Sequence, residues 1–141
     1  MKLKRKRGFS LLELLTVIII IGILVTLALP LFYKTRERAL DNEAKANLKL
    51  IQAAQRIYAM ERGEFLNCEI FGMDGNSCIN DFLKLTLPKG PRRNWDYNTV
   101  APSGSTFIST AIRVTNEMEW LRTWALNETA EEPTCSGAGC P

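Results

Sequence analysis

An uninterrupted apolar stretch near the N-terminus, residues 9–33, limits what this chain of 141 residues can fold into. Its 25 positions contain a single charged residue, Glu13, and are rich in Ile, Leu and Val. As a helix, this stretch would be about 37 Å long, which exceeds the roughly 30 Å of hydrocarbon in a bilayer. The stretch therefore predicts a membrane-spanning helix, followed by a soluble part of about a hundred residues that can bury only a modest core.

The basic residues of the chain are concentrated before the apolar stretch. Five of the 18 lysines and arginines lie in the first eight residues: Lys2, Lys4, Arg5, Lys6 and Arg7. The formal net charge is +3, but residues 9–141 contain 13 basic and 15 acidic residues and are nearly neutral. A basic end before an apolar segment stays in the cytoplasm, so we expect the rest of the chain outside it. The charge therefore gives no support for general nucleic-acid binding.

The composition argues against an enzyme. The chain contains no histidine, which excludes Ser-His-Asp and Cys-His nucleophiles as well as histidine-bound metals. Neither of two Gly-rich phosphate-binding patterns occurs, G-x-x-x-x-G-K before Ser or Thr, and G-x-G-x-x-G. We therefore expect neither catalytic residues nor a cofactor.

Two features of the apolar stretch decide how it is interpreted. Ala28-Leu29-Pro30 is a poor signal-peptidase site, because proline would directly follow the cleavage point, so we expect the stretch to be retained. Glu13 places a carboxylate in hydrocarbon, which costs at least a few kcal/mol. Its side chain could reach the cytoplasmic headgroups. Alternatively, Glu13 pairs with a cation from elsewhere, such as a new amino terminus at Phe9 of a neighbouring subunit.

The residues around this carboxylate resemble a known family. The run KRGFSLLE, in which Gly8 and Phe9 are followed by Glu13, resembles the cleavage and methylation signature of type IV pilins and type II secretion pseudopilins. The resemblance extends from Lys4 to about Tyr33 and continues as helix beyond it. The residues after about position 65 give no comparably specific match.

The resemblance implies how the N-terminus is processed. A membrane prepilin peptidase would remove the leader, residues 1–8, by cutting between Gly8 and Phe9, and would N-methylate Phe9. Glu13 would then pair with the methylated amine of a neighbouring subunit. Gly22 and Pro30 correspond to helix-softening residues of the family. One interpretation is that the helix melts locally between them on assembly. The other is that they are ordinary glycine and proline residues of a transmembrane helix. From its chemistry alone, Pro30 should break or kink the helix.

The resemblance also implies a function and its partners. The chain would be a structural subunit of a type IV pilus or a pseudopilus. It would assemble with copies of itself and other pilins, served by the prepilin peptidase and an inner-membrane assembly platform with its ATPase. It would reside in the bacterial inner membrane, and then in an extracellular pilus or a periplasmic pseudopilus. Alternatives are a minor or DNA-uptake pilin with a receptor role, and a single-pass anchored binding domain that does not polymerise.

Residues 34–62 keep a helical period after the chain becomes polar. The face expected in the core comprises Leu40, Ala44, Asn47/Leu48, Ile51, Ala54/Gln55 and Tyr58. The opposite face carries Arg36, Asp41, Lys45, Lys49, Gln52 and Arg56. Arg62-Gly63 is a good helix stop, so one helix is expected from Phe9 to Arg62.

Residues 63–141 are expected to form a small globular head. Residues 65–77 have the composition of a loop, and 79–87 could be a short helix or strand. Three strands are expected at 94–100, 106–114 and 117–126, although a helix is an alternative for the last. We predict an antiparallel meander packed on the long helix, an α+β fold.

The four cysteines, Cys68, Cys78, Cys135 and Cys140, are expected to form disulfides outside the cytoplasm. Local pairing of the first two and of the last two would fasten two short loops. The alternative joins one of the first two cysteines to the C-terminal pair. A zinc site made from all four thiolates has unsuitable spacing and compartment.

Two weaker constellations occur in the head. Four basic residues surround two aromatic ones, as in a single-strand nucleic-acid groove: Lys84, Lys89, Arg92, Arg93, Trp95 and Tyr97. The favoured interpretation is a solvated loop beside two core aromatics, so nucleic acid is an unlikely partner. A second group, Asp74, Asn76, Asn80 and Asp81, lacks the glycine and glutamate of an EF-hand, and we expect no metal site.

Overall fold

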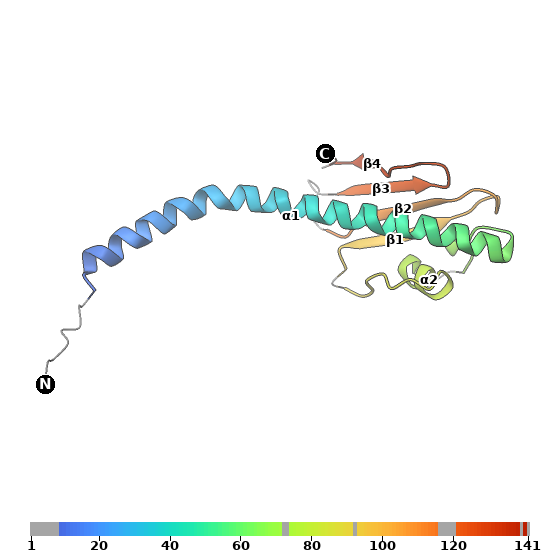
Figure 1. The fold of residues 1–141 in the computed structure, drawn as a ribbon, viewed down its shortest axis with the longest axis horizontal. Helices are drawn as coiled ribbons and strands as arrows, with labels where there is room; N and C mark the ends of the chain where they lie inside the picture. Colours follow the sequence, from blue (N-terminus) through green and yellow to red (C-terminus); the bar gives the residue numbers. More distant parts are fainter. Residues whose placement is uncertain (1–8, 72–73, 92, 116–120, 139, 141) are drawn as a thin grey trace, which may run out of the picture. The chain divides into compact units, whose positions relative to one another are not determined.

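The computed structural model describes residues 9–71, 74–91, 93–115, 121–138 and 140. It divides into two compact units, one ending at Ala39 and the other, called the head from here on, comprising Leu40–Pro141. The elements are α1 (Leu11–Arg62), the 3₁₀ helix η1 (Cys68–Phe71), α2 (Gly75–Phe82), and the strands β1 (Trp95–Val100), β2 (Ile108–Arg113), β3 (Arg122–Asn127) and β4 (Thr134–Gly137) (Figure 1). The predicted α+β fold, a long N-terminal helix with an antiparallel sheet, is confirmed.

The N-terminal unit consists of the first half of α1. The helix begins where Ser10 accepts hydrogen bonds from the amides of Glu13 and Leu14, at 3.1 and 3.2 Å. It then continues through Gly22 and Pro30 without interruption. Of the break or kink expected at Pro30, a break is absent, because one proline removes a single N–H while the turns on either side keep their own hydrogen bonds.

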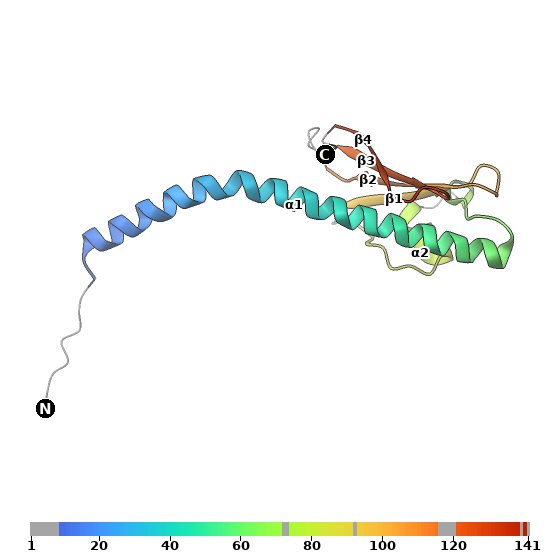
Figure 2. The ribbon, with the colours of Figure 1, turned by 45° about the horizontal axis from the view of Figure 1, so that its top comes forward.

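The second half of α1 packs along the sheet of the head (Figure 2). Ala44, Leu48 and Ile51 are completely buried, as the helical period predicted. Two residues expected on the solvent face, Asp41 and Gln52, are also buried, which corrects that part of the prediction. The buried face is wider than the apolar pattern indicated, because the head supplies polar partners for both side chains. The helix ends as expected at Arg62, with Gly63 in the left-handed region at φ 82°.

The sheet is a four-stranded antiparallel meander in the order β1-β2-β3-β4. Its register pairs Trp95 with Arg113 and Ala111 with Trp124. Two strands were predicted nearly to their ends, and the third is a strand from Arg122 onward, with residues 116–120 outside the described chain. The fourth strand, β4, was missed because its sequence, TCSG, has no apolar alternation.

The apolar side chains of β2 lie on the outer face of the sheet. Ile108 and Ile112 are 51% and 45% exposed, whereas Ser109, Ala111 and Arg113 face the core. The reason is steric: large tryptophans on β1 and β3 lie on the inner face, and the small side chain of Ala111 fits beside them. Alternation identified the strand, but it did not identify which face is buried.

The segment expected as a loop at 65–77 contains η1 and the beginning of α2. Asn76, completely buried, connects α2 to the sheet: its Oδ1 accepts from the amide of Tyr97 at 2.6 Å, and its Nδ2 donates to the carbonyl of Pro88 at 2.8 Å. A Cβ at Gly75 would lie 2.0 Å from the carbonyl oxygen of Tyr97. Glycine is therefore required at the start of α2, where helix and strand approach each other closely.

Candidate assembly site

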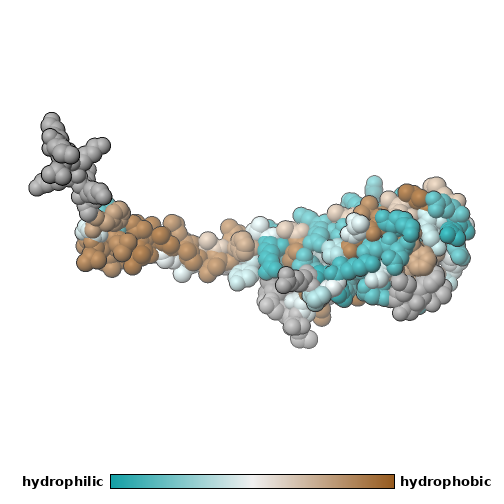
Figure 3. Space-filling model, turned by 90° about the horizontal axis from the view of Figure 1, so that it is seen from below, coloured by the Kyte–Doolittle hydropathy of each residue, from teal (hydrophilic) through white to brown (hydrophobic). Residues whose placement is uncertain are grey.

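The apolar surface of α1 is the most unusual feature of the N-terminal unit. Every described side chain from Leu11 to Leu29 is exposed, and Figure 3 shows apolar residues covering the visible face of this segment. The helix is long and apolar enough to cross a membrane. Monomeric soluble proteins rarely expose a continuous apolar patch larger than a few hundred Å². This surface therefore requires lipid or other apolar helices around it.

Glu13 lies within this surface, in the first turn of α1. Its carboxylate makes no hydrogen bond or ion pair with another residue that the structure describes. The side chains beside it, Leu11, Leu12, Leu14, Leu15 and Ile18, line a shallow apolar groove. Phe9 is 76% exposed, whereas Gly8 lies outside the described residues. An apolar partner that covers this groove would remove water from the carboxylate, which must then pair with a cation or take up a proton.

The threonine hydroxyl groups of the N-terminal unit donate hydrogen bonds to carbonyls of their own helix. Thr16 Oγ1 donates to the carbonyl of Glu13 at 2.9 Å, and Thr26 Oγ1 donates to that of Ile23 at 2.7 Å. Thr35 Oγ1 donates to the carbonyl of Leu31 at 2.9 Å. These threonines therefore present methyl groups and satisfied hydroxyls to an apolar environment.

A buried polar cluster joins the head's part of α1 to β3. Asp41 Oδ1 accepts from Arg122 Nε at 2.5 Å and from Trp124 Nε1 at 3.2 Å. Lys45 Nζ lies 4.2 Å from the centre of the Trp124 ring. Arg122 is 2% exposed and Asp41 6%, so the pair is sheltered from water. The sequence did carry a signal for Asp41, because it lies three residues before Ala44 on the same helical stripe.

Two glutamines of α1 attach other parts of the head. Gln55 donates to the carbonyl of Leu66 at 3.0 Å and to Thr99 Oγ1 at 2.8 Å, and accepts from the amide of Leu66 at 2.9 Å. Gln52 donates to the carbonyls of Asn127 and Ala130, at 2.7 and 2.9 Å. These contacts fix the chain after α1 and the β3–β4 connection to the helix. They explain why polar residues occupy the buried face.

Tyr97 of β1 joins the sheet to the same helix. Its phenolic oxygen accepts a hydrogen bond of 2.8 Å from Asn47 Nδ2. Burial raises the pKa of Tyr97 to about 12, although the hydrogen bond from Asn47 acts in the opposite direction. The ring is 2% exposed and belongs to the core.

The described members of the basic and aromatic group agree with the favoured interpretation, a loop beside two core aromatics. Trp95, 1% exposed, donates its ring N–H to the carbonyl of Leu40 at 3.0 Å, so neither it nor Tyr97 offers a face for stacking. Arg93 pairs with Asp96, Lys89 lies 3.7 Å from Asp81, and Lys84 donates to the carbonyl of Asp81. Arg92 lies outside the described residues. Within the described ranges, no group of three or more acidic or cysteine residues could hold a metal.

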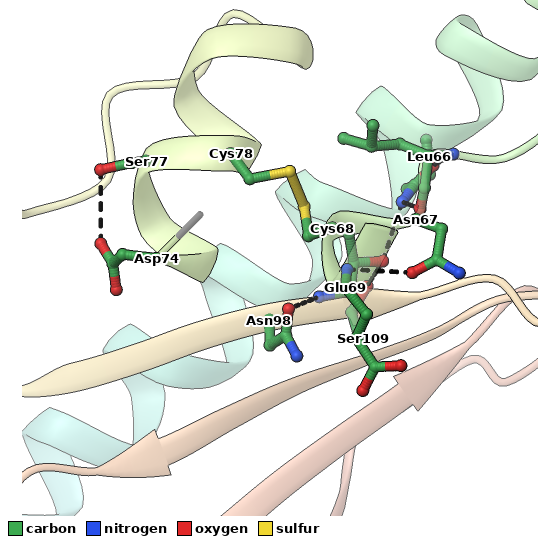
Figure 4. The surroundings of a disulfide bond; sticks show 11 residues. Leu66, Asn67, Cys68, Glu69, Asp74, Ser77, Cys78, Asn98 and Ser109 are labelled. Carbon is green, nitrogen blue, oxygen red and sulfur yellow. Dashed lines mark hydrogen bonds between the residues drawn. A yellow bond between two sulfur atoms is a disulfide. The ribbon is translucent and has the colours of Figure 1, made fainter. Parts of the chain in front are cut away.

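The cysteines form the two local disulfides, Cys68–Cys78 and Cys135–Cys140. The first is buried and joins η1 to α2, and Figure 4 shows it between these two segments, to one side of the strands. The second closes the chain after β4 and is partly exposed. One bridge therefore stabilises the core, and the other fastens Cys140, near the C-terminus, to β4.

The N-terminus also matches a described family. Residues 3–29 match the family described as "Prokaryotic N-terminal methylation motif". This range contains the glycine–phenylalanine junction, Glu13 and most of the exposed apolar surface. No solved structure matches the chain significantly.

Several curated proteins are similar to the first half of the chain. The type IV major pilin protein PilA of Myxococcus xanthus is 44% identical over 61 residues, which are 43% of this chain and 28% of that protein. Type II secretion system core protein G of Klebsiella pneumoniae is 30% identical over 67 residues, 48% of each chain. Competence protein ComGC of Halalkalibacterium halodurans is 34% identical over 88 residues, 59% of this chain and 85% of ComGC. The chain thus spans less than half the length of the first two relatives and most of the third.

Proposed function

The chain belongs to the family of type IV pilins and secretion pseudopilins, and on that premise we propose that it is a structural subunit of a helical filament, a type IV pilus or a pseudopilus. The observation that carries this proposal is the exposed apolar half of α1 with one carboxylate, Glu13, in its first turn. Apolar helices of neighbouring subunits would cover this surface. A non-enzymatic role agrees with the absence of histidine from the chain.

Processing would create the cation that Glu13 lacks. In this proposal, prepilin peptidase cuts between Gly8 and Phe9 and methylates the new amine of Phe9, which remains positively charged. The amine of Phe9 would be a poor partner for Glu13 of its own helix, because both groups lie at the helix end, where water remains accessible. In a filament, the amine of one subunit would pair with Glu13 of the next, because two unmatched charges among apolar helices cost several kcal/mol. The pair would select the correct axial stagger.

The proposed location and partners follow from this arrangement. The subunit would be anchored in the bacterial inner membrane by the first half of α1, with its head outside the cytoplasm, before it enters the filament. Copies of itself and other pilins would be its filament partners. An assembly platform with an ATPase would supply the work, since no phosphate-binding pattern occurs in this chain.

Substitution of Glu13 tests the proposal. Glu13→Val should insert and be processed normally, because an apolar residue is favourable in a bilayer. It should give few or no filaments, because the amine of the neighbour loses its partner. Processed monomer and sheared filament are compared by immunoblot, and the intact mass should show the loss of residues 1–8 and the gain of one methyl group.

Thr16→Val is the matched control in the next turn, since its hydroxyl bonds only within its own helix and should leave filament yield unchanged. Wild-type filament yield from Glu13→Val would contradict the pairing. A mature mass that retains residues 1–8 would favour the anchored binding domain that does not polymerise.

A further inference from the structure

Three basic residues come directly after the apolar segment of α1. Lys34, Arg36 and Arg38, called the basic band from here on, are all exposed. No ion pair or hydrogen bond connects any of them to another residue that the structure describes. Glu37 lies in the same turn, so residues 34–38 carry a net charge of +2.

The angular positions of these cations distinguish between two kinds of partner. At 3.6 residues per turn, Arg38 lies about 40° from Lys34 around the helix, and Arg36 lies about 200° from it. Two of the cations therefore lie on one face of the helix, and the third lies on the opposite face. A single protein surface could contact only one of these faces, whereas lipid headgroups meet both faces of a membrane-spanning helix.

The axial positions agree with lipid headgroups. The band spans about 6 Å along the helix, and one headgroup layer is roughly 5–8 Å thick. The helix from Leu11 to Tyr33 is about 35 Å long, which is enough to cross the hydrocarbon and bring the band to the opposite surface. Phe32 and Tyr33, 66% and 58% exposed, precede the band directly. Exposed aromatic residues beside cations are typical of a membrane–water interface.

We propose that the basic band binds anionic lipid headgroups at the outer surface of the inner membrane and sets the depth of the membrane-anchored subunit. The inference rests on the proposed function, which places this helix in a membrane. Once residues 1–8 have been removed, the band holds the first basic side chains of the chain, because residues 9–33 contain no lysine or arginine. With the band at the outer headgroups, Glu13 lies about 30 Å away from Tyr33 along the helix, at the inner boundary of the hydrocarbon.

Native mass spectrometry of the processed chain, from which residues 1–8 have been removed, tests the proposal. The protein is released from micelles that contain equal amounts of phosphatidylglycerol and phosphatidylcholine. The bound molecules of each lipid are then counted. The wild-type chain should retain phosphatidylglycerol preferentially. In the triple variant Lys34→Gln, Arg36→Gln and Arg38→Gln, the ratio of bound phosphatidylglycerol to bound phosphatidylcholine should fall roughly tenfold, because each cation near an anionic surface contributes to the attraction.

A second triple variant provides the matched control. Arg62→Gln, Lys84→Gln and Lys89→Gln removes the same charge from exposed positions of the head and should keep the wild-type preference. An equal loss in the control would mean that net charge alone attracts the lipid, and it would overturn the proposal. An unchanged preference in the band variant would also overturn it.

The assay is independent of filament assembly, so its result can be read even if the filament proposal fails. Filament yield is measured separately for the band variant. If that yield falls while the lipid preference remains unchanged, the band is a contact between subunits, and the lipid proposal is wrong.

Discussion

Residues 11–39 and residues 40–62 belong to one continuous helix but have opposite relations to the rest of the chain. In the first segment, apolar residues lie on all sides and remain exposed; in the second, a stripe containing Leu48 and Ile51 is buried against the head. The charged residues differ in the same way: Glu13 has no partner within the described chain, whereas Asp41 has two. The first segment is built for partners outside the subunit, and the second for the subunit itself.

The largest expected effect concerns these two carboxylates. Asp41→Ala should destabilise the head by about 3 kcal/mol, because it removes the buried carboxylate that accepts hydrogen bonds from Arg122 Nε and Trp124 Nε1. Glu13→Ala should leave the unfolding of the head unchanged, since Glu13 has no contact there. Urea unfolding of the full chain in mild detergent, followed by tryptophan fluorescence, compares the two. Equal stability of both variants would mean that the buried pair does not hold α1 to β3.

A pair of leucines gives the next comparison. Leu48→Ala should cost about 3 kcal/mol of head stability, because Leu48 is completely buried and its removal leaves a cavity. Leu24→Ala, in the exposed segment, should cost the head nothing. Leu50→Ala adds a control two residues from Leu48, since Leu50 is 49% exposed. The same unfolding measurement applies, and a large effect of Leu50→Ala would show that the stripe has been assigned to the wrong face.

The smallest expected effect is the pH dependence of the contact between Tyr97 and α1. The folded pKa of Tyr97, about 12, lies above its ordinary value near 10, so the neutral phenol is favoured by folding. Its contribution to stability is complete below pH 10 and is lost as the pH rises from 10 through 12, by at most about 1.4 kcal/mol per pH unit. Tyr97→Phe should remove this part of the alkaline slope. An identical slope in both proteins would assign the alkaline loss to other groups.

The sequence predicted the features that depend on local pattern. The extent of α1, three of the strands and the short-range cysteine pairs follow from helical period, alternation and spacing. The helical stripe of Ala44 includes Asp41, but the partners of Asp41 and Gln52 lie more than 70 residues away, and no local pattern identifies them. The outward face of β2 depends on the tryptophans of neighbouring strands. For the candidate site, the glycine–phenylalanine junction and Glu13 were visible because a short motif contains them.

The threonine hydroxyls of the first segment bear on how reversibly α1 can move between the membrane and a filament. Because Thr16, Thr26 and Thr35 bond to carbonyls of their own helix, α1 carries its hydrogen bonds with it from one environment to another. In the filament proposed above, exchanging lipid neighbours for protein neighbours would break none of these bonds. Apolar surface is equally well accommodated by lipid tails and by other apolar helices. The exchange would therefore have little preferred direction, and its direction must be imposed by work done on the subunit from outside.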